Sequence, residues 1–427
     1  MSTLLIRNGR VMDPARYMDE VRDVWIVDGR FAPEGLRLTR ADETLDAAGL
    51  LVMPGLVDVH VHLREPGNEA AETIETGCAA ALAGGYTSII CMPNTTPALD
   101  TPERLRAVLS KAAALRGPHV YALGAITVGR QGKALVDFAA LERAGALGFT
   151  DDGNGVQDAD LIRAAMEQCA ALGKRIAEHC EVASRVAGGV MHRGAASERA
   201  KLPGIPAEAE SEMAERDVLL CAQTGAALHL QHISGALSMN ILRDARARGV
   251  NVTAEATPHH LALTDEHAAD GGPDFKMNPP LRSERDRREL LRGVSDGILG
   301  IIATDHAPHT KEAKAAGFRA APFGVIGMET AAAVIWTHLV LEGFLSPEQM
   351  VERMSTAPAE AFELKAGTMR PGRPGDVTLF DPAMTWTVNA EHFRSRSRNC
   401  PFAGQTLQGR VAATIVDGEV RYRDAVR

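Results

Sequence analysis

Histidines and aspartates gather at a few points along this chain, and each point directly follows a short apolar run. The segment His60-Val61-His62 is the first, and the segment from Asp305 to His309 is the last. Because residues two apart on a strand face the same side, His60 and His62 are expected to point into one site. Imidazole and carboxylate are ligands of catalytic zinc, and two metals that share a hydroxide need about four histidines and two carboxylates. The ends of the apolar runs supply this inventory: His60, His62, Asp151, Asp152, His179, His232 and Asp305.

A single histidine at the end of a strand is more often a structural residue than a ligand. Five polar strand ends in succession make coincidence a poor explanation, so the sequence predicts a metal site. Other histidines are interpreted differently: His259 and His260 are expected to pack beside or support the site, and His306 to be structural. Histidines in predicted helices or loops are expected at the surface, namely His192, His267, His338 and His392.

Eight apolar runs, separated by alanine- and leucine-rich segments of helical period, must position these residues. Strands that alternate with helices indicate βαβ units and a parallel sheet, and eight such units predict an α/β fold, a closed (β/α)8 barrel of the TIM type. In such barrels the chemistry lies at the carboxyl ends of the strands, where the polar residues stand here. The predicted strands are 56–59, 87–91, 120–123, 146–149, 175–177, 227–230, 250–253 and 298–302.

Both ends of the chain are rich in β-forming residues. Short apolar runs precede the turn dipeptides Asn8-Gly9 and Asp28-Gly29, and the same pattern returns before Asp417-Gly418. We therefore expect one small β domain built from both termini, residues 1–54 with 366–427, beside a catalytic barrel of residues 55–365. Two separate flanking hairpins would leave the same signal.

The composition is that of an ordinary globular protein, with 45% hydrophobic and 24% charged residues and a net charge of -9. A nucleic-acid surface needs clustered Lys and Arg, whereas the basic run 282–288 alternates in sign and favours a solvated helix start. The six widely spaced cysteines are expected to be reduced and buried. No segment resembles a signal peptide or a membrane span, so a cytoplasmic protein without membrane contact is expected.

Four segments resemble the signatures of type I dihydroorotases, which belong to the amidohydrolase superfamily of metal-dependent barrels. The HxH pattern alone is weak, but the four segments occur in order and at the spacing of barrel strands, and the likeness covers nearly the whole chain. They are Asp58–Gly67 (DVHVHLREPG), Met92–Thr95 (MPNT), Lys276–Arg282 (KMNPPLR) and Ala303–His309 (ATDHAPH).

This resemblance implies a set of metal ligands. His60 and His62 would bind a first zinc ion, and His179 and His232 a second. Asp305 would complete the first site and act as the catalytic acid and base. The family pattern places the bridging ligand at Asp152, directly before Gly153, and leaves Asp151 as the alternative. One or two Zn²⁺ ions are implied for each subunit, with a binuclear site as the expectation.

The resemblance also implies substrate contacts. Arg64, Asn94 and His309 match family positions that bind the substrate's carboxylate, and Asn278 matches one that contacts the pyrimidine ring. Arg64 lies two residues after His62, so it can offer a planar set of donors that suits a carboxylate. Arg64 could instead form an ion pair at the barrel rim, and the two asparagines could be loop residues only.

The implied reaction is the reversible, zinc-dependent hydrolysis of (S)-dihydroorotate to N-carbamoyl-L-aspartate, a step of pyrimidine biosynthesis. Asp305 would take a proton from the attacking hydroxide and pass it to the departing ring nitrogen. The segment from Thr310 to Gly324 would form a lid over the mouth of the barrel, or a plain surface excursion.

Other functions stay open at this point. A hydantoinase or allantoinase would share the fold, but those relatives typically bridge their metals with a carboxylated lysine, and Thr150-Asp151-Asp152-Gly153 has none. An inactive dihydroorotase-like scaffold for aspartate carbamoyltransferase would have lost ligands, whereas this chain keeps all six. A zinc-free binding barrel is a further alternative. A homodimer is expected, and an active enzyme could also bind the carbamoyltransferase.

Overall fold

The computed structural model describes residues 2–36 and 38–425. Its central sheet is parallel, and its strands lie in the order β15-β14-β13-β10-β9-β8-β7-β6. A bridge between Val61 and His306 joins the first strand to the segment after the last, which brings the sheet round into a barrel. The strands are β6 (Leu56–Val61), β7 (Tyr86–Cys91), β8 (His119–Gly124), β9 (Ala146–Thr150), β10 (Arg175–Glu178), β13 (Ala227–Leu230), β14 (Val252–Ala256) and β15 (Ile301–Ile302).

One main helix connects each barrel strand to the next and covers the outside of the sheet. Helix α4 shows why these segments are helical: Asp158 caps its first turn, Gly173 ends it in the left-handed conformation, and its buried residues recur with helical period. The predicted (β/α)8 barrel is thereby confirmed. The connecting helices are α1 (Ile74–Ala83), α2 (Pro102–Ala113), α3 (Phe138–Ala144), α4 (Ala159–Leu172), α7 (Glu208–Thr224), α8 (Ala236–Ala247) and α11 (Glu284–Ser295).

Short elements fill the loops that follow the strands, at the mouth of the barrel. They are η2 (Val128–Arg130), α5 (Ala183–Val186), β11 (Met191–His192), α6 (Ala195–Ala200), β12 (Gly204–Ile205), α9 (Pro258–Ala262), α10 (Asp265–Gly271), η3 (Pro273–Phe275) and α12 (Lys311–Lys314). The chain then leaves the barrel through α13 (Ala331–Ile335), η4 (Trp336–Val340), α14 (Pro347–Val351), η5 (Glu352–Thr356) and α15 (Ala357–Ala361).

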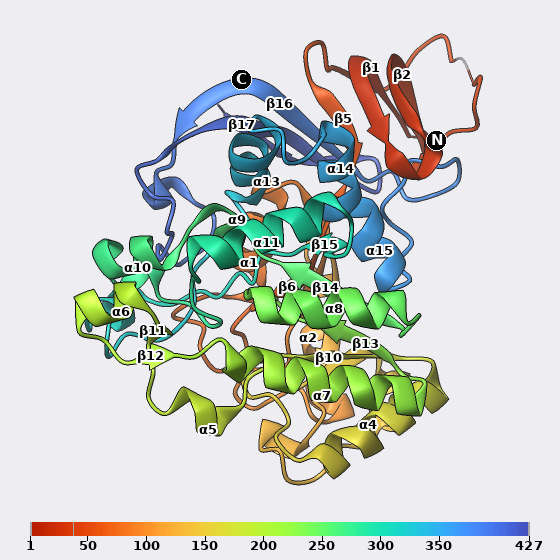
Figure 1. Cartoon of the computed structure of the whole chain (residues 1–427). Coiled ribbons are helices and arrows are strands. Elements are labelled where there is room, and N and C mark those ends of the chain that lie inside the picture. The colour runs from red at the N-terminus through yellow and green to blue at the C-terminus, as the bar shows by residue number, and fades with distance from the viewer. Residues whose placement is uncertain (1, 37, 426–427) are drawn as a thin grey trace.

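A second sheet contains strands from both ends of the chain, and it lies above the barrel in Figure 1, coloured red and blue. Its order is β18-β17-β16-β5-β1-β2-β3, with β4 paired to β1. The pairing of β5 with β16 joins the two termini, which confirms a small β domain of composite origin. The strands are β1 (Thr3–Asp13), β2 (Met18–Val27), β3 (Arg30–Phe31), β4 (Glu43–Asp46), β5 (Leu51–Pro54), β16 (Val377–Thr387), β17 (Thr406–Val416) and β18 (Glu419–Arg423); η1 (Pro14–Arg16) and η6 (Ala390–His392) lie in connections.

One predicted turn is not a turn. Strand β1 continues through Asn8-Gly9, where Asn8 has a φ of 62° and the register with β2 shifts between Ile6 and Gly9. A β-bulge uses the same residues as a tight turn because both need a positive φ. Asp28-Gly29 and Asp417-Gly418 do lie between paired strands, as predicted.

Three residues expected in solvent are buried: His192, Arg282 and Asp286. His192 is 8% exposed and Arg282 is 3% exposed, although α11 itself begins at Glu284. The Arg282 guanidinium donates to Ser234 Oγ at 3.0 Å and lies 3.5 Å from a carboxylate oxygen of Glu210. A buried charge needs such partners, and they lie 48 and 72 residues away in the sequence.

All six cysteines are free and buried, as predicted. Within residues 2–36 and 38–425, no helix combines the length and the apolar character needed to cross a membrane.

Candidate metal centre

Four imidazoles surround one carboxylate at the carboxyl ends of the barrel strands. The oxygens of Asp152, which follows β9, lie 3.3 Å from His60 Nε2, 3.6 Å from His62 Nε2, 3.8 Å from His179 Nδ1 and 3.6 Å from His232 Nε2. All five residues are at most 5% exposed. Strands β6, β9, β10 and β13 thus bring together residues that are up to 172 positions apart in the sequence (60 to 232).

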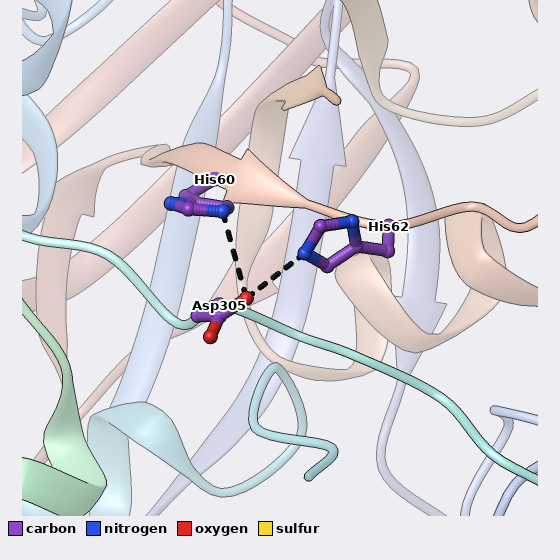
Figure 2. Close-up of side chains that lie close together, drawn as sticks. All are labelled: His60, His62 and Asp305. Atoms are coloured by element: carbon purple, nitrogen blue, oxygen red, sulfur yellow. Dashed lines mark hydrogen bonds and ion pairs between the residues drawn. The ribbon is translucent and has the colours of Figure 1, made fainter. Parts of the chain in front are cut away.

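Asp305 brings a second carboxylate to this group from the segment after β15. Its Oδ1 atom lies 2.9 Å from His62 Nε2 and 3.5 Å from His60 Nε2. Figure 2 shows the carboxylate of Asp305 facing both rings. In this cluster, two sets of donor atoms are close enough to share an ion: His60, His62 and Asp305, and His60, Asp152 and His232. His179 Nδ1 lies 2.9 Å from His232 Nε2, beside the second set.

The two neighbouring aspartates of the fourth strand end point in different directions. Asp151 Oδ1 accepts hydrogen bonds from the backbone N–H groups of Ile126 and Thr127, at 2.8 and 3.1 Å, and the Thr127 hydroxyl donates to its other oxygen. Asp151 therefore ties the loop after β8 to β9. Asp152, and not Asp151, faces the imidazoles.

The charges in the cluster depend on one another. Burial alone would lower the pKa of His60, but the carboxylates of Asp152, Glu255 and Asp305 outweigh it and raise that pKa well above its usual value. Burial likewise acts to raise the pKa of Asp305, and the imidazoles of His60 and His62 instead hold it well below its usual range. Both carboxyl groups of the cluster are ionised at neutral pH, because the imidazoles also lower the pKa of Asp152.

The backbone is strained where the site residues stand. Arg64, His232 and Asp305 have φ angles of 58°, 31° and 46°, a region that residues other than glycine seldom adopt. Such conformations cost free energy and are typical of functional sites, where the surrounding structure fixes them.

The donor set fits a divalent cation. His60 Nε2 is buried and has no hydrogen-bond partner, although it faces two carboxylates. His179 follows β10 and His232 follows β13, and one ring nitrogen of each lies next to the other. Imidazole nitrogens with carboxylate oxygens are the ligands that zinc takes in hydrolases, so the residues present could hold such an ion.

A cavity of about 240 Å³ opens beside this cluster, and all four predicted substrate residues lie in its wall: Arg64, Asn94, Asn278 and His309. Arg64 Nε donates to the Pro308 carbonyl at 3.1 Å, and burial lowers the pKa of Arg64 to about 10, so it stays cationic at neutral pH. The rim carboxylate Glu65 pairs with Lys111 instead of Arg64. Asn278 Oδ1 is buried without a hydrogen-bond partner in the described structure.

Asn94 and His309 are already engaged. Asn94 Oδ1 lies 2.8 Å from His62 Nδ1, and its Nδ2 donates to Asp152 at 3.3 Å, so it orients two candidate ligands. His309 Nε2 lies 2.7 Å from the Phe323 carbonyl, which fixes the proton on Nε2. Burial, with Arg64 beside it, lowers the pKa of His309 to about 3, so the ring is neutral.

Sequence patterns missed a buried group beneath the site. Glu255 on β14 lies 2.5 Å from His60 Nδ1 and 2.9 Å from His229 Nε2, and all three residues are at most 1% exposed. Glu255 holds the far nitrogen of a candidate ligand, as carboxylates do in metal sites. Polar residues inside apolar barrel strands, His229 in β13 and Glu255 in β14, were the available signal.

Two further buried histidines, His260 and His306, serve the surrounding structure. His260 lies 2.9 Å from the Pro279 carbonyl and 2.7 Å from Thr257 Oγ1, while His306 Nδ1 accepts from the Gly327 N–H at 3.2 Å. Both contacts agree with the supporting and structural roles expected for them.

Known proteins resemble this chain both in sequence and in structure. The family model for dihydro-orotase-like proteins matches residues 49–238. A dihydroorotase of Pelotomaculum thermopropionicum is 47% identical over 99% of both chains, and one of Brevibacillus brevis is 43% identical over 99% of both. Among solved structures, the L-hydantoinase of Arthrobacter aurescens superposes with a TM-score of 0.88 at 26% identity, covering 99% of this chain and 96% of the other.

Proposed function

The chain belongs to the dihydroorotase family, and we propose that its clustered imidazoles and carboxylates hold two zinc ions that serve the dihydroorotase reaction. The reaction itself, hydrolysis of the cyclic amide bond of dihydroorotate, follows from relatives that are 42–47% identical over the full chain. The observation that carries the metal proposal is the position of Asp152, within 3.8 Å of four imidazole nitrogens.

The proposed ligands divide into two sets with one shared carboxylate. His60, His62 and Asp305 would hold the first ion, and His179 and His232 the second. Asp152 lies between the sets and would bridge the ions. When bound, zinc supplies a water of lowered pKa and polarises the amide carbonyl.

A side chain of the protein, Asp305, would transfer the proton during the reaction. Asp305 is ionised and reaches into the cluster, so it would accept a proton from the attacking water. It would then deliver that proton to the departing ring nitrogen, and the reverse path would close the ring.

Recognition of the substrate would rest on the cavity wall. Dihydroorotate carries one carboxylate, and Arg64 is a half-buried cation without an ion-pair partner among the described residues. Arg64 would bind that carboxylate together with Asn94, with the ring of His309 beside the guanidinium, while the unpartnered Asn278 Oδ1 would accept a hydrogen bond from the pyrimidine ring.

The structural likeness to hydantoinases does not favour their chemistry for this chain. Asp152 occupies the end of the fourth strand, so no lysine is available there for carboxylation. An aspartate has a shorter side chain than a carboxylated lysine, and we therefore expect the two ions to bind with unequal affinity.

Removal and return of the metal tests this proposal. The enzyme is stripped with a chelator and titrated with zinc alone, and bound zinc and dihydroorotate hydrolysis are measured on the same samples. We expect activity to return without bicarbonate and to saturate at two ions per chain, with one ion lost first on mild chelation. A requirement for bicarbonate would exclude an aspartate bridge, and full activity in the stripped enzyme would exclude the metal.

The homodimer, a complex with aspartate carbamoyltransferase, a cytoplasmic location and the domain boundaries after residues 54 and 365 stay predictions from the sequence.

A further inference from the structure

Two buried lysines lie behind the wall of the substrate cavity, outside the proposed metal site. Lys276 follows η3, and Lys314 is the last residue of α12. They are 3% and 4% exposed, and within the described residues neither forms an ion pair. Buried lysines are rare unless they are paired, so this arrangement requires a reason.

Backbone carbonyls take the place of carboxylates around both ammonium groups. Lys314 Nζ donates to the carbonyls of Lys276, Pro322 and Gly324, at 3.1, 3.1 and 2.8 Å. Lys276 Nζ donates to those of Arg319 and Ala321, at 3.0 and 2.6 Å, and lies 4.5 Å from the centre of the Phe323 ring. An ammonium has three donors, and Lys314 uses all of them.

These bonds have two consequences. They fix the segment Arg319–Gly324, because four of its carbonyls are held by two side chains. They also leave the positive charges unneutralised, since a carbonyl is a dipole without net charge. Asp274 acts on Lys314 from beyond ion-pair distance, but burial is stronger and lowers the pKa of Lys314 to about 8.

The fixed segment touches the substrate cavity directly. Phe323 and Gly324 line it, and Phe323 lies between Pro322 and Gly324, two of the three residues whose carbonyls Lys314 holds. The Phe323 carbonyl in turn holds His309, whose ring lies 3.5 Å from the Arg64 guanidinium. Gly324 has a φ of 132°, and a Cβ there would stand 2.9 Å from His309 Nε2, so the segment presses closely against that ring.

We propose that Lys276 and Lys314 form a cationic clasp that positions the segment Arg319–Gly324 against His309 and makes the cavity selective for a substrate bearing a carboxylate. The proposal rests on the proposed function, in which Arg64, held beside the ring of His309, receives the carboxylate of dihydroorotate. The clasp acts through His309 and through the positive potential of two buried charges behind the wall. The two lysines are therefore positioning and selectivity residues, and they do not touch the reacting atoms.

The clasp is tested by Lys314→Met, which keeps the length of the side chain and removes its charge and donors. We expect KM for dihydroorotate to rise about tenfold or more, with kcat within about threefold and an unchanged zinc content. The matched control is Lys311→Met on the same helix, because Lys311 is exposed and pairs with Glu391 at the surface. Its KM should stay within about twofold of the wild-type value.

Two inhibitors distinguish the effect of the ligand's negative charge from the effect of its shape. Orotate carries the carboxylate, and its methyl ester has nearly the same size without the charge. Lys314→Met should weaken inhibition by orotate about tenfold and leave inhibition by the ester within about twofold. Equal losses for both inhibitors, or an unchanged KM, would overturn the proposal.

Folding is followed by circular dichroism in the same preparations. If Lys314→Met does not fold, Lys276→Met is measured in its place, with the same direction of change expected. Failure of both variants beside a folded Lys311→Met would assign the lysines to stability alone and overturn the clasp. A wild-type enzyme that does not hydrolyse dihydroorotate would instead refute the proposed function, a result distinct from any of these.

Discussion

Histidine and aspartate meet at both ends of the barrel. At the mouth, His60, His62, His179 and His232 surround Asp152 and Asp305, and no side chain in the group is more than 8% exposed. At the opposite end, His119 begins β8, and its Nε2 atom lies 3.1 Å from Asp376 and 3.8 Å from Asp417. The residue types are the same, and three donor atoms are close together in both places.

The surroundings of the two clusters differ. The Asp417 side chain is 54% exposed and that of His119 is 30% exposed, so water competes for both. Arg421 also acts on His119 there, and a second cation would be repelled. At the mouth a buried glutamate, Glu255, holds the far side of His60. Ligand types alone therefore do not define a metal centre; burial, convergence from several strands and a supporting carboxylate do.

The largest effect is expected from the aspartate of the mouth cluster. Asp305→Asn should fold normally and lose about 10²–10⁴-fold in kcat in both directions, because an amide cannot carry the proton. Asp376→Asn is the matched change at the opposite end and should stay within about twofold of wild type. Turnover of the Asp305 variant within tenfold of wild type, with the same pH profile, would mean that another group carries the proton.

A smaller effect is expected from the substrate side of the same cavity. Arg64→Met should lower kcat/KM for dihydroorotate about 30-fold or more, since removing the partner of a buried carboxylate costs roughly 2–5 kcal/mol. Metal content should not change, because Arg64 binds none of the candidate ligands. A loss below threefold would show that the carboxylate is bound elsewhere.

The support beneath the mouth cluster should matter for the metal more than for the substrate. Glu255→Gln removes the negative charge beside His60 and should weaken zinc binding about 10- to 100-fold. Competition with a chromogenic chelator measures this without an activity assay. Asp376→Asn, which removes a carboxylate charge at the opposite end of the barrel, is the control; equal zinc affinities in the two variants would show that Glu255 does not support the metal site.

The smallest effect is expected at the opposite end of the barrel. The contact with Asp376 raises the pKa of His119, and burial opposes it. A raised pKa in the folded state means that the contact stabilises the protein at low pH and that this contribution is lost as pH rises through the folded value. His119→Asn should lower the thermal midpoint by about 2 °C or less at pH 6 and by less at pH 9. Loss of bound zinc from His119→Asn would show that the cluster at the opposite end also holds metal, which would contradict the difference between the two clusters.

The barrel, the composite β domain and the histidines of the mouth could be predicted from the sequence because each leaves a local pattern in it. Apolar runs mark the strands, and His60 and His62 share a face through the two-residue period of a strand. The choice between Asp151 and Asp152 needed the family pattern, since neighbouring residues on a strand end differ only in direction. The structure supplies the reason: Asp151 bonds to the loop after β8.

Features that depend on distant partners left no local signature. Glu255 and His60 are 195 positions apart, and Arg282 is buried only because Glu210 and Ser234 lie near it. Charged residues are normally exposed, so Lys314 also looks like a surface residue until the carbonyls around it are seen. The bulge at Asn8 has the residues of a turn, but strand β1 continues through it instead of reversing direction.

The metal centre at the mouth of the barrel is tested by measuring zinc content together with turnover. Elemental analysis and a dihydroorotate assay are applied to the wild type, to His60→Ala and His232→Ala at the mouth, and to His119→Ala at the opposite end. We expect up to two zinc ions per chain and full activity in the wild type and the His119 variant, with loss of both metal and activity in the two mouth variants. Full zinc occupancy with normal turnover in either mouth variant would contradict this expectation.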